Sequence, residues 1–121
     1  MNKVFPKVLN LNNRSASEWT NATGVSGSFT SFNPLTSVNF ARCDYNNLID
    51  YTNYNKIVYT VTKSDTSNLL IVEPNDAFPN YTIQGSGTKS GEVDISGITG
   101  LHRIAIQSTG GNVQFSKFQF E

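Results

Sequence analysis

Apolar and polar residues alternate with a period of two in several short stretches of the chain, which is typical of β-strands. The clearest is IVYTVT at 57–62, where both alternating sets are β-branched or aromatic, so we predict a central strand. LLIV at 69–72 is fully apolar between polar neighbours, as in a buried strand. Further strands are predicted within 38–43, 82–84, 92–95, 102–108 and 112–120.

Turn-forming residues separate these stretches, and helical periodicity is almost absent. Gly, Asn, Asp and Pro gather in the gaps, for example in PND at 74–76 and GSG at 85–87. Seven to nine short strands at this spacing predict an all-β fold, an antiparallel β-sandwich. A chain of 121 residues is long enough to bury its own core, so we expect one domain over 1–121.

The pattern also predicts which side chains face inward. We expect a shared core from residues that alternate on the strongest strand signals: Ile57, Tyr59, Val61, Ile104, Ile106 and Phe115.

The last predicted strand changes phase in its middle. Val113 and Phe115 share one parity, whereas Phe118 and Phe120 share the other. A β-bulge near residues 116–117 would turn all four side chains into one core. The alternative is that a phenyl group faces a second buried surface, such as a neighbouring subunit.

A polar run at 50–55, rich in Tyr and Asn, leads directly into the central strand. Asp50 and Thr52 are suited to hydrogen-bond nearby backbone N–H groups, so we interpret the run as a turn that sets the register of the strand. Tyr51 and Tyr54 are expected to lay their rings over the sandwich edge with their hydroxyls in water.

Charge excludes some classes of partner. Lys plus Arg and Asp plus Glu number nine each, so the net charge is zero and only 15% of residues are charged. We therefore expect no nucleic-acid binding, and a neutral polar ligand rather than a charged one. No apolar run is long enough for membrane insertion, and the N-terminal residues show no signal peptide. We expect a chain that is not exported by that route, or a domain excised from a longer protein.

The residues needed for most catalytic chemistry are scarce. His102 is the sole histidine and Cys43 the sole cysteine, so a disulfide within the chain and a His/Cys metal cluster are both excluded. The sequence leaves open a pair of carboxylates that meets only in the folded chain. We predict no enzyme activity, no catalytic residue and no cofactor. The acidic residues form no calcium-loop signature, so a structural calcium ion is not supported.

Two regions resemble a known family. IDYTNYNKIVYTV at 49–61 is similar to the entry into the middle strand of the galactose-binding-like β-sandwiches. GEVDISGITGLHRIAIQS at 91–108 and VQFSKFQFE at 113–121 resemble the closing strand pair of the same jelly rolls. The resemblance implies a jelly-roll carbohydrate-binding module of the kind found in phage tail and baseplate proteins.

Candidate ligand-binding residues follow from the chemistry of sugars, which present apolar faces ringed by hydroxyl groups. Trp19 lies in the polar stretch SASEWTNATG, where it would serve as a stacking platform or else plug one end of the sandwich. FARCDYNN at 40–47 gathers polar groups and a ring at a strand end. The predicted ligand-binding residues are Trp19, Arg42, Asp44, Tyr45, Tyr81 and His102.

These observations favour non-catalytic binding of a neutral carbohydrate. With the resemblance, they predict that the chain recognises a cell-wall saccharide on the host surface as a component of a multimeric phage tail or baseplate, located in the virion. If the resemblance does not hold, we expect the protein to be located outside the cell or at the cell surface. The alternative function is a structural or oligomerisation β-sandwich of a virion or adhesion protein, with no sugar site.

Overall fold

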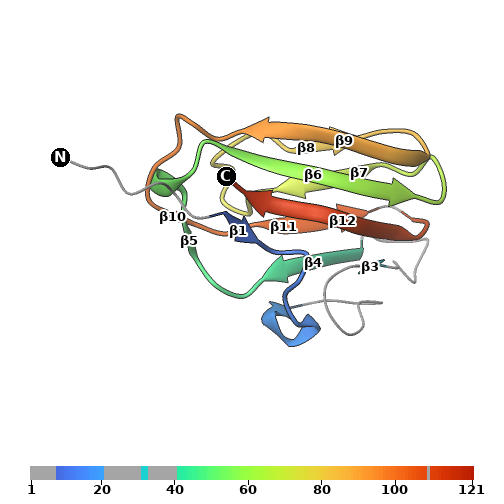
Figure 1. Cartoon of the computed structure of the whole chain (residues 1–121), viewed down its shortest axis with the longest axis horizontal. Coiled ribbons are helices and arrows are strands. Elements are labelled where there is room, and N and C mark those ends of the chain that lie inside the picture. The colour runs from blue at the N-terminus through green and yellow to red at the C-terminus, as the bar shows by residue number, and fades with distance from the viewer. Residues whose placement is uncertain (1–7, 21–30, 33–40, 109) are drawn as a thin grey trace.

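The computed structural model describes residues 8–20, 31–32, 41–108 and 110–121, and it shows an antiparallel β-sandwich (Figure 1). The strands of the first sheet are β1 (Leu9–Asn10), β3 (Ser31–Phe32), β6 (Lys56–Lys63), β9 (Gly87–Asp94) and β12 (Val113–Phe120). Those of the second are β2 (Trp19–Thr20), β4 (Ala41–Tyr45), β7 (Leu69–Val72), β8 (Tyr81–Ile83) and β11 (Ala105–Ser108).

Three smaller elements complete the described fold. β5 (Ile49–Asp50) and β10 (Leu101–His102) pair as a separate two-stranded ribbon. Two 3-10 turns, η1 (Ala16–Glu18) and η2 (Tyr51–Asn53), precede β2 and β6. None of the helices in the described part of the chain is long and apolar enough to cross a membrane.

Strands far apart in the sequence lie side by side in both sheets. The first sheet runs β1–β12–β6–β9, with β3 also pairing with β12, and the second runs β2–β4–β11–β7–β8. Figure 1 shows the first sheet in front of the second, with the β5–β10 ribbon at one end. The predicted all-β antiparallel sandwich is therefore confirmed.

One hydrophobic core fills the space between the sheets. All six side chains predicted to face inward are buried, including Ile57 and Ile104, which are fully covered. Ring contacts join the sheets: Trp19 of β2 lies 6.5 Å from Phe118 of β12, measured between ring centroids. Because both sheets bury their apolar side chains against each other, neither is stable without its partner.

The predicted bulge in β12 is present. Phe115 pairs with Val61 and Lys117 with Thr60, so Ser116 is the extra residue. The side chains of Phe115 and Phe118 are both buried as a result.

The Asn12 side chain satisfies polar groups that this bulge leaves without partners in the ladder. Its Nδ2 donates to the Ser116 carbonyl at 3.3 Å, and its Oδ1 accepts from the Phe118 N–H at 3.2 Å. Asn12 is itself buried, so the bulge is a closed hydrogen-bonded feature of the fold.

The run before the central strand is a turn, as predicted. Asp50 caps η2 by accepting a hydrogen bond from the Thr52 N–H at 3.1 Å, and Thr52 Oγ1 accepts one from the Gly100 N–H at 2.8 Å. The prediction for Tyr51 was wrong, because its hydroxyl is not in water. The side chain is fully buried and donates to the Arg103 carbonyl at 2.7 Å.

Several predicted strands differ in extent from the observed ones, most of all the stretch 92–95, which is the end of β9 (Gly87–Asp94). Residues 38–40 of the stretch 38–43 lie outside the described residues, and β4 continues to Tyr45 with Cys43 and Tyr45 inward. The stretch 102–108 is divided into β10 and β11, because neither 103 nor 104 has a registered partner in either ladder. The Ile104 carbonyl still accepts a hydrogen bond from the Tyr45 N–H at 3.0 Å. Burial raises the pKa of the Cys43 thiol, with a smaller contribution from the Asp44 carboxylate, so the thiol stays protonated.

Replacing Ile104 by Ala should lower the free energy of unfolding by about 2–5 kcal/mol, because the fully buried side chain would leave a cavity. Chemical denaturation measures the loss. Leu101→Ala is the control, since that leucine is 63% exposed and its truncation should cost less than about 0.5 kcal/mol. A loss below about 1 kcal/mol for Ile104→Ala would contradict its assigned place in the core.

Gly91 leaves room for the ring of Tyr59 on the neighbouring strand. A Cβ atom at residue 91 would lie 2.5 Å from the Tyr59 hydroxyl oxygen, and Tyr59 is buried and hydrogen-bonded to Tyr81. Gly91→Ala should therefore cost about 1–3 kcal/mol through overpacking. Gly97→Ala is the matched control, because nothing lies within 4 Å of its added Cβ. Equal stabilities of the two variants would show that the ring moves aside freely.

Candidate functional site

A break in strand pairing creates a hollow on the outer side of the second sheet. Asp44 pairs with Ala105, and Ile49 pairs with His102. Four residues therefore separate these pairs on the β4–β5 side, but only two on the β10–β11 side. Tyr45 still donates its N–H to the Ile104 carbonyl at 3.0 Å, whereas Asn46 and Asn47 form a bend. A hollow of about 530 Å³ lies beside this bend.

We call this hollow the β4 pocket. Its lining comes from β2, β4, the bend after β4, and the segments following β7 and preceding β11. The lining residues are Thr20, Arg42, Asp44, Tyr45, Asn46, Pro74 and Arg103.

Strand β4 supplies a carboxylate and a guanidinium on the outer face of the sheet. Arg42 and Asp44 are two residues apart and therefore point to the same side, opposite to the buried Cys43. Both Arg42 Nε and Nη2 donate to Asp44 Oδ1, at 3.1 and 2.8 Å. Among the described residues, nothing donates to Asp44 Oδ2, so this oxygen is able to accept a further hydrogen bond at the pocket.

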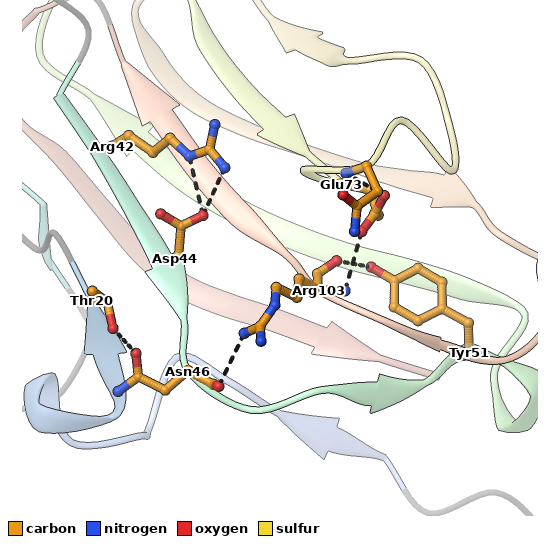
Figure 2. A network of polar contacts seen from close by, with 8 residues as sticks. Thr20, Arg42, Asp44, Asn46, Tyr51, Glu73 and Arg103 are labelled. Atoms are coloured by element: carbon orange, nitrogen blue, oxygen red, sulfur yellow. Dashed lines mark hydrogen bonds and ion pairs between the residues drawn. The ribbon is translucent and has the colours of Figure 1, made fainter.

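Asn46 joins the bend after β4 to the segment around β2. Its Nδ2 donates to the Ser17 carbonyl at 3.1 Å, and its side-chain oxygen accepts a hydrogen bond from the Thr20 hydroxyl. Its backbone N–H donates to the Glu18 carbonyl at 2.8 Å. These contacts fix the wall of the β4 pocket that contains Thr20. Figure 2 shows the one between Thr20 and Asn46.

The main chain of Arg103 is held from both sides. Its N–H donates to Glu73 Oε2 at 3.2 Å, and its carbonyl accepts from the Tyr51 hydroxyl at 2.7 Å (Figure 2). The guanidinium Nη1 donates to the Asn46 carbonyl at 3.3 Å, and the residue is exposed. The backbone of Arg103 is thus fixed by two hydrogen bonds. Its exposed guanidinium still has N–H groups, besides the one bonded to Asn46, that are able to form hydrogen bonds at the pocket.

Glu73 also organises the opposite wall. The carboxylate is fully buried, and its Oε1 accepts from the N–H groups of Asn75 and Ala77 at 2.8 and 3.0 Å. It therefore fixes the turn that contains Pro74 and the main chain of Arg103 at the same time. Burial and the Glu73 charge both raise the pKa of Tyr51, so its hydroxyl remains a donor to the Arg103 carbonyl.

The structure brings three of the predicted site residues together. Arg42, Asp44 and Tyr45 all line the β4 pocket. Tyr45 contributes little ring surface, because it is only 4% exposed and its hydroxyl donates to Glu18 Oε1 at 3.3 Å. Most of its ring is packed in the core, 5.2 Å from the ring of Trp19.

The stacking platform predicted at Trp19 is contradicted. Trp19 is only 4% exposed, and its ring lies 5.2 Å from that of Tyr45 in an edge-on arrangement. The cause is the pairing of Trp19 with Tyr45, which turns both rings between the sheets. Trp19 is the core plug that the sequence left as the alternative.

Tyr81 and His102 also lie outside the β4 pocket. Tyr81 is on β8, separated from β4 by β11 and β7, and its hydroxyl is 3.1 Å from that of Tyr59 across the sandwich. The His102 ring packs edge-on against Tyr51 at 5.0 Å, and its Nε2 lies 2.8 Å from the Thr99 carbonyl oxygen. Both side chains have structural contacts that the strand pattern did not reveal.

Arg103, Glu73, Thr20 and Pro74 were missed from the sequence. In the sequence, Arg103 stands between His102 and Ile104, so alternation predicts an outward side chain for it. Nothing in the pattern distinguishes it from other outward residues. Glu73 directly precedes the turn residues PND, and acceptor side chains at this position commonly bond backbone N–H groups further along a turn. The sequence therefore contained a signal for the hydrogen bonds from the turn to Glu73. It contained none for the contact between Glu73 and Arg103.

The chemistry of the lining is that of hydrogen bonding. The described lining contains one carboxylate and two guanidinium groups, but neither a histidine nor a second carboxylate. Within the described part of the chain, no group of three or more His, Cys, Asp or Glu residues is placed to hold a metal ion.

No protein-family model matches the chain, and no curated protein matches it. Solved structures do resemble it. A mutant of the family 29 carbohydrate binding module CBM29-2 is 12% identical, with a TM-score of 0.60, over 95% of this chain and 91% of that one. A family 6 carbohydrate-binding module is 17% identical, with a TM-score of 0.55, over 95% and 92% of the two chains.

A third structure is larger than this chain. A family two carbohydrate esterase from Clostridium thermocellum, in complex with cellohexaose, is 13% identical with a TM-score of 0.48. The match covers 67% of this chain but only 24% of the esterase chain. At such low identities, what this chain shares with the two modules is the β-sandwich fold.

Replacing Glu73 by Gln should lower the free energy of unfolding by about 1–3 kcal/mol, because an amide nitrogen would face backbone N–H groups that now donate to the carboxylate. Urea denaturation provides the measurement. The control is Glu92→Gln, which removes an exposed ion pair with Lys56 and should cost less than about 1 kcal/mol. Losses of equal size would refute the organising role of Glu73.

Proposed function

We propose that the β4 pocket binds a neutral saccharide without catalysing a reaction. The observation that carries the proposal is the arrangement of Arg42, Asp44 and Arg103, which presents fixed donors and an acceptor oxygen around one hollow. Sugar hydroxyl groups both donate and accept hydrogen bonds, and so can use both kinds of group at once.

The balance of charge supports a neutral ligand. Arg42 is paired with Asp44, and the buried Glu73 carboxylate lies directly behind the main chain of Arg103. The positive and negative groups around the pocket therefore offset one another, as they do over the whole chain, whose net charge is zero. A polyanion would find little net attraction here, whereas paired charges remain strong hydrogen-bonding groups for hydroxyls.

The fold supports the same proposal. Two structures that share the sandwich over nearly their whole length are named as carbohydrate-binding modules of families 29 and 6. We carry that class of ligand over to this chain because its sandwich presents a polar pocket of suitable chemistry.

The sequence resemblance to modules of phage tail and baseplate proteins extends the proposal. In this extended form the saccharide belongs to a host cell wall, and the chain works within a multimeric tail in the virion. Retention of the purified chain by cell-wall polysaccharide from a range of bacteria, with no retention by other glycans, would support the extended form. If none of these cell-wall polysaccharides retains the chain, the extended form is contradicted. The experiment below then tests the saccharide site by itself.

Replacing Arg103 by Ala should weaken binding of the saccharide selected on a glycan array by about tenfold to a hundredfold, because hydrogen bonds from a charged donor are lost. Isothermal titration calorimetry measures the affinity, which we expect in the micromolar to millimolar range for the unaltered chain. Binding should persist in 1 M NaCl, unlike a contact with a polyanion.

Arg14→Ala is the matched control for this experiment, since Arg14 also donates one side-chain hydrogen bond to a backbone carbonyl, that of Asn10, and does not line the pocket. Its affinity should equal that of the unaltered chain. Absence of any saccharide on the array would favour the structural or oligomerisation function instead. Binding that Arg103→Ala leaves intact would place the site elsewhere.

A further inference from the structure

The ribbon of β5 and β10 has one outward face that begins at the β4 pocket. Leu101 pairs with Asp50, and His102 pairs with Ile49. Ile49 is buried and His102 is half-buried against Tyr51, so these two side chains point inward. The alternate residues on each strand therefore point outward, and both Asp50 and Leu101 are exposed.

Arg103 belongs both to this outward face and to the pocket. It is exposed, and it is two residues from Leu101, which puts their side chains on the same side. Leu48 directly precedes Ile49, the partner of His102, so it lies at the end of the ribbon that adjoins Arg103. At a rise of about 3.3 Å per residue, Leu101 begins roughly 7 Å from the Arg103 position at the pocket.

Two exposed leucines occupy this part of the face. Leu48 is 50% exposed and Leu101 is 63% exposed, so each presents a large apolar surface to water. Leu48 adjoins Ile49 and Leu101 adjoins His102, and Ile49 and His102 are paired across the ribbon, so both leucines are within reach of one small molecule. We call them the leucine pair.

The size of the leucine pair decides what it fits. A stable protein interface buries about 800 Å² on each partner, far more than two half-exposed leucines provide. One sugar ring matches the pair in size, and each ring has a face of C–H groups that gains by leaving water. Continuity with the pocket then identifies the occupant as the sugar unit next to the one held by Arg103.

We propose that the leucine pair is a second subsite, which holds the apolar face of a neighbouring sugar ring. The inference rests on the proposed function of the β4 pocket and deepens it. The ligand is an oligosaccharide of at least two units: one unit is hydrogen-bonded at Arg42, Asp44 and Arg103, and the next lies on Leu48 and Leu101.

The experiment compares chain lengths. Calorimetric titrations use the mono-, di-, tri- and hexasaccharides of β-1,4-linked glucose, mannose, xylose and N-acetylglucosamine. For the series that binds, affinity should rise about tenfold from the monosaccharide to the di- or trisaccharide. The double variant Leu48→Thr/Leu101→Thr should bind the monosaccharide as the unaltered chain does and lose this rise. Threonine keeps a strand-forming, β-branched side chain at both positions.

Val8→Thr is the matched control, because Val8 is another exposed apolar residue, 53% exposed, that precedes a strand of the first sheet. It should keep the rise in affinity. Melting temperatures of all variants test that each is folded.

Three results would overturn the inference in different ways. A rise in affinity that persists in the double variant overturns the second subsite alone. A dimer of the unaltered chain in analytical ultracentrifugation that becomes monomeric in the double variant assigns the leucine pair to self-association instead. If no series binds the unaltered chain, the proposed function fails and the subsite fails with it.

Discussion

The alternation of inward and outward side chains is the constraint on which this structure depends. Each strand has to turn its large apolar groups between the two sheets, because the chain has no disulfide to hold it together. A strand with a period of two can do so only while its apolar residues keep the same parity. Within the described part of the chain, two interruptions of this regular pairing have a clear structural result.

The first interruption completes the core, and the second accompanies the β4 pocket. In β12 the extra residue Ser116 restores the phase of the phenyl groups, and Asn12 satisfies the polar groups that the bulge exposes. Between the β4–β11 ladder and the β5–β10 ribbon, Asn46 and Asn47 are both exposed and take no part in the core. Their backbone instead offers the Asn46 carbonyl to Arg103 and leaves a hollow between the two segments.

Buried polar groups make this hollow a fixed arrangement. Tyr51 and Glu73 are both fully buried, and between them they bind the carbonyl and the N–H of Arg103. Their hydrogen bonds are formed within the protein before any ligand arrives, so little ordering is left to oppose binding. A saccharide exchanges hydrogen bonds with water for similar ones with protein, and its affinity therefore depends strongly on such preorganisation.

The sequence predicted the features that rest on local pattern. The central strand at 57–62, the inward parity of its side chains and the bulge in β12 all follow from the order of apolar residues in one stretch. Arg42 and Asp44 were identified because their polar side chains gather where a strand ends.

The remaining features depend on pairing between distant segments. Trp19 is in a strand of two residues, too short to show alternation, and only its pairing with β4 decides that the ring is inside. Arg103 is positioned by Glu73, which is 30 residues away in the chain. Neither contact has a signature in sequence spacing, and so the stacking platform was predicted wrongly and the pocket was predicted only in part.

The most direct test of the account is a two-dimensional NMR titration of the isotope-labelled chain with the saccharide that binds best on the array. We predict that the largest shift changes fall on the backbone of Thr20, of Asn46 and of Arg103, together with the Arg103 side chain. The outer face of β6 and β9, which belongs to the other sheet, should stay unchanged. Changes confined to β6 and β9, or no changes at saturating saccharide, would contradict the assignment of the β4 pocket as a saccharide site.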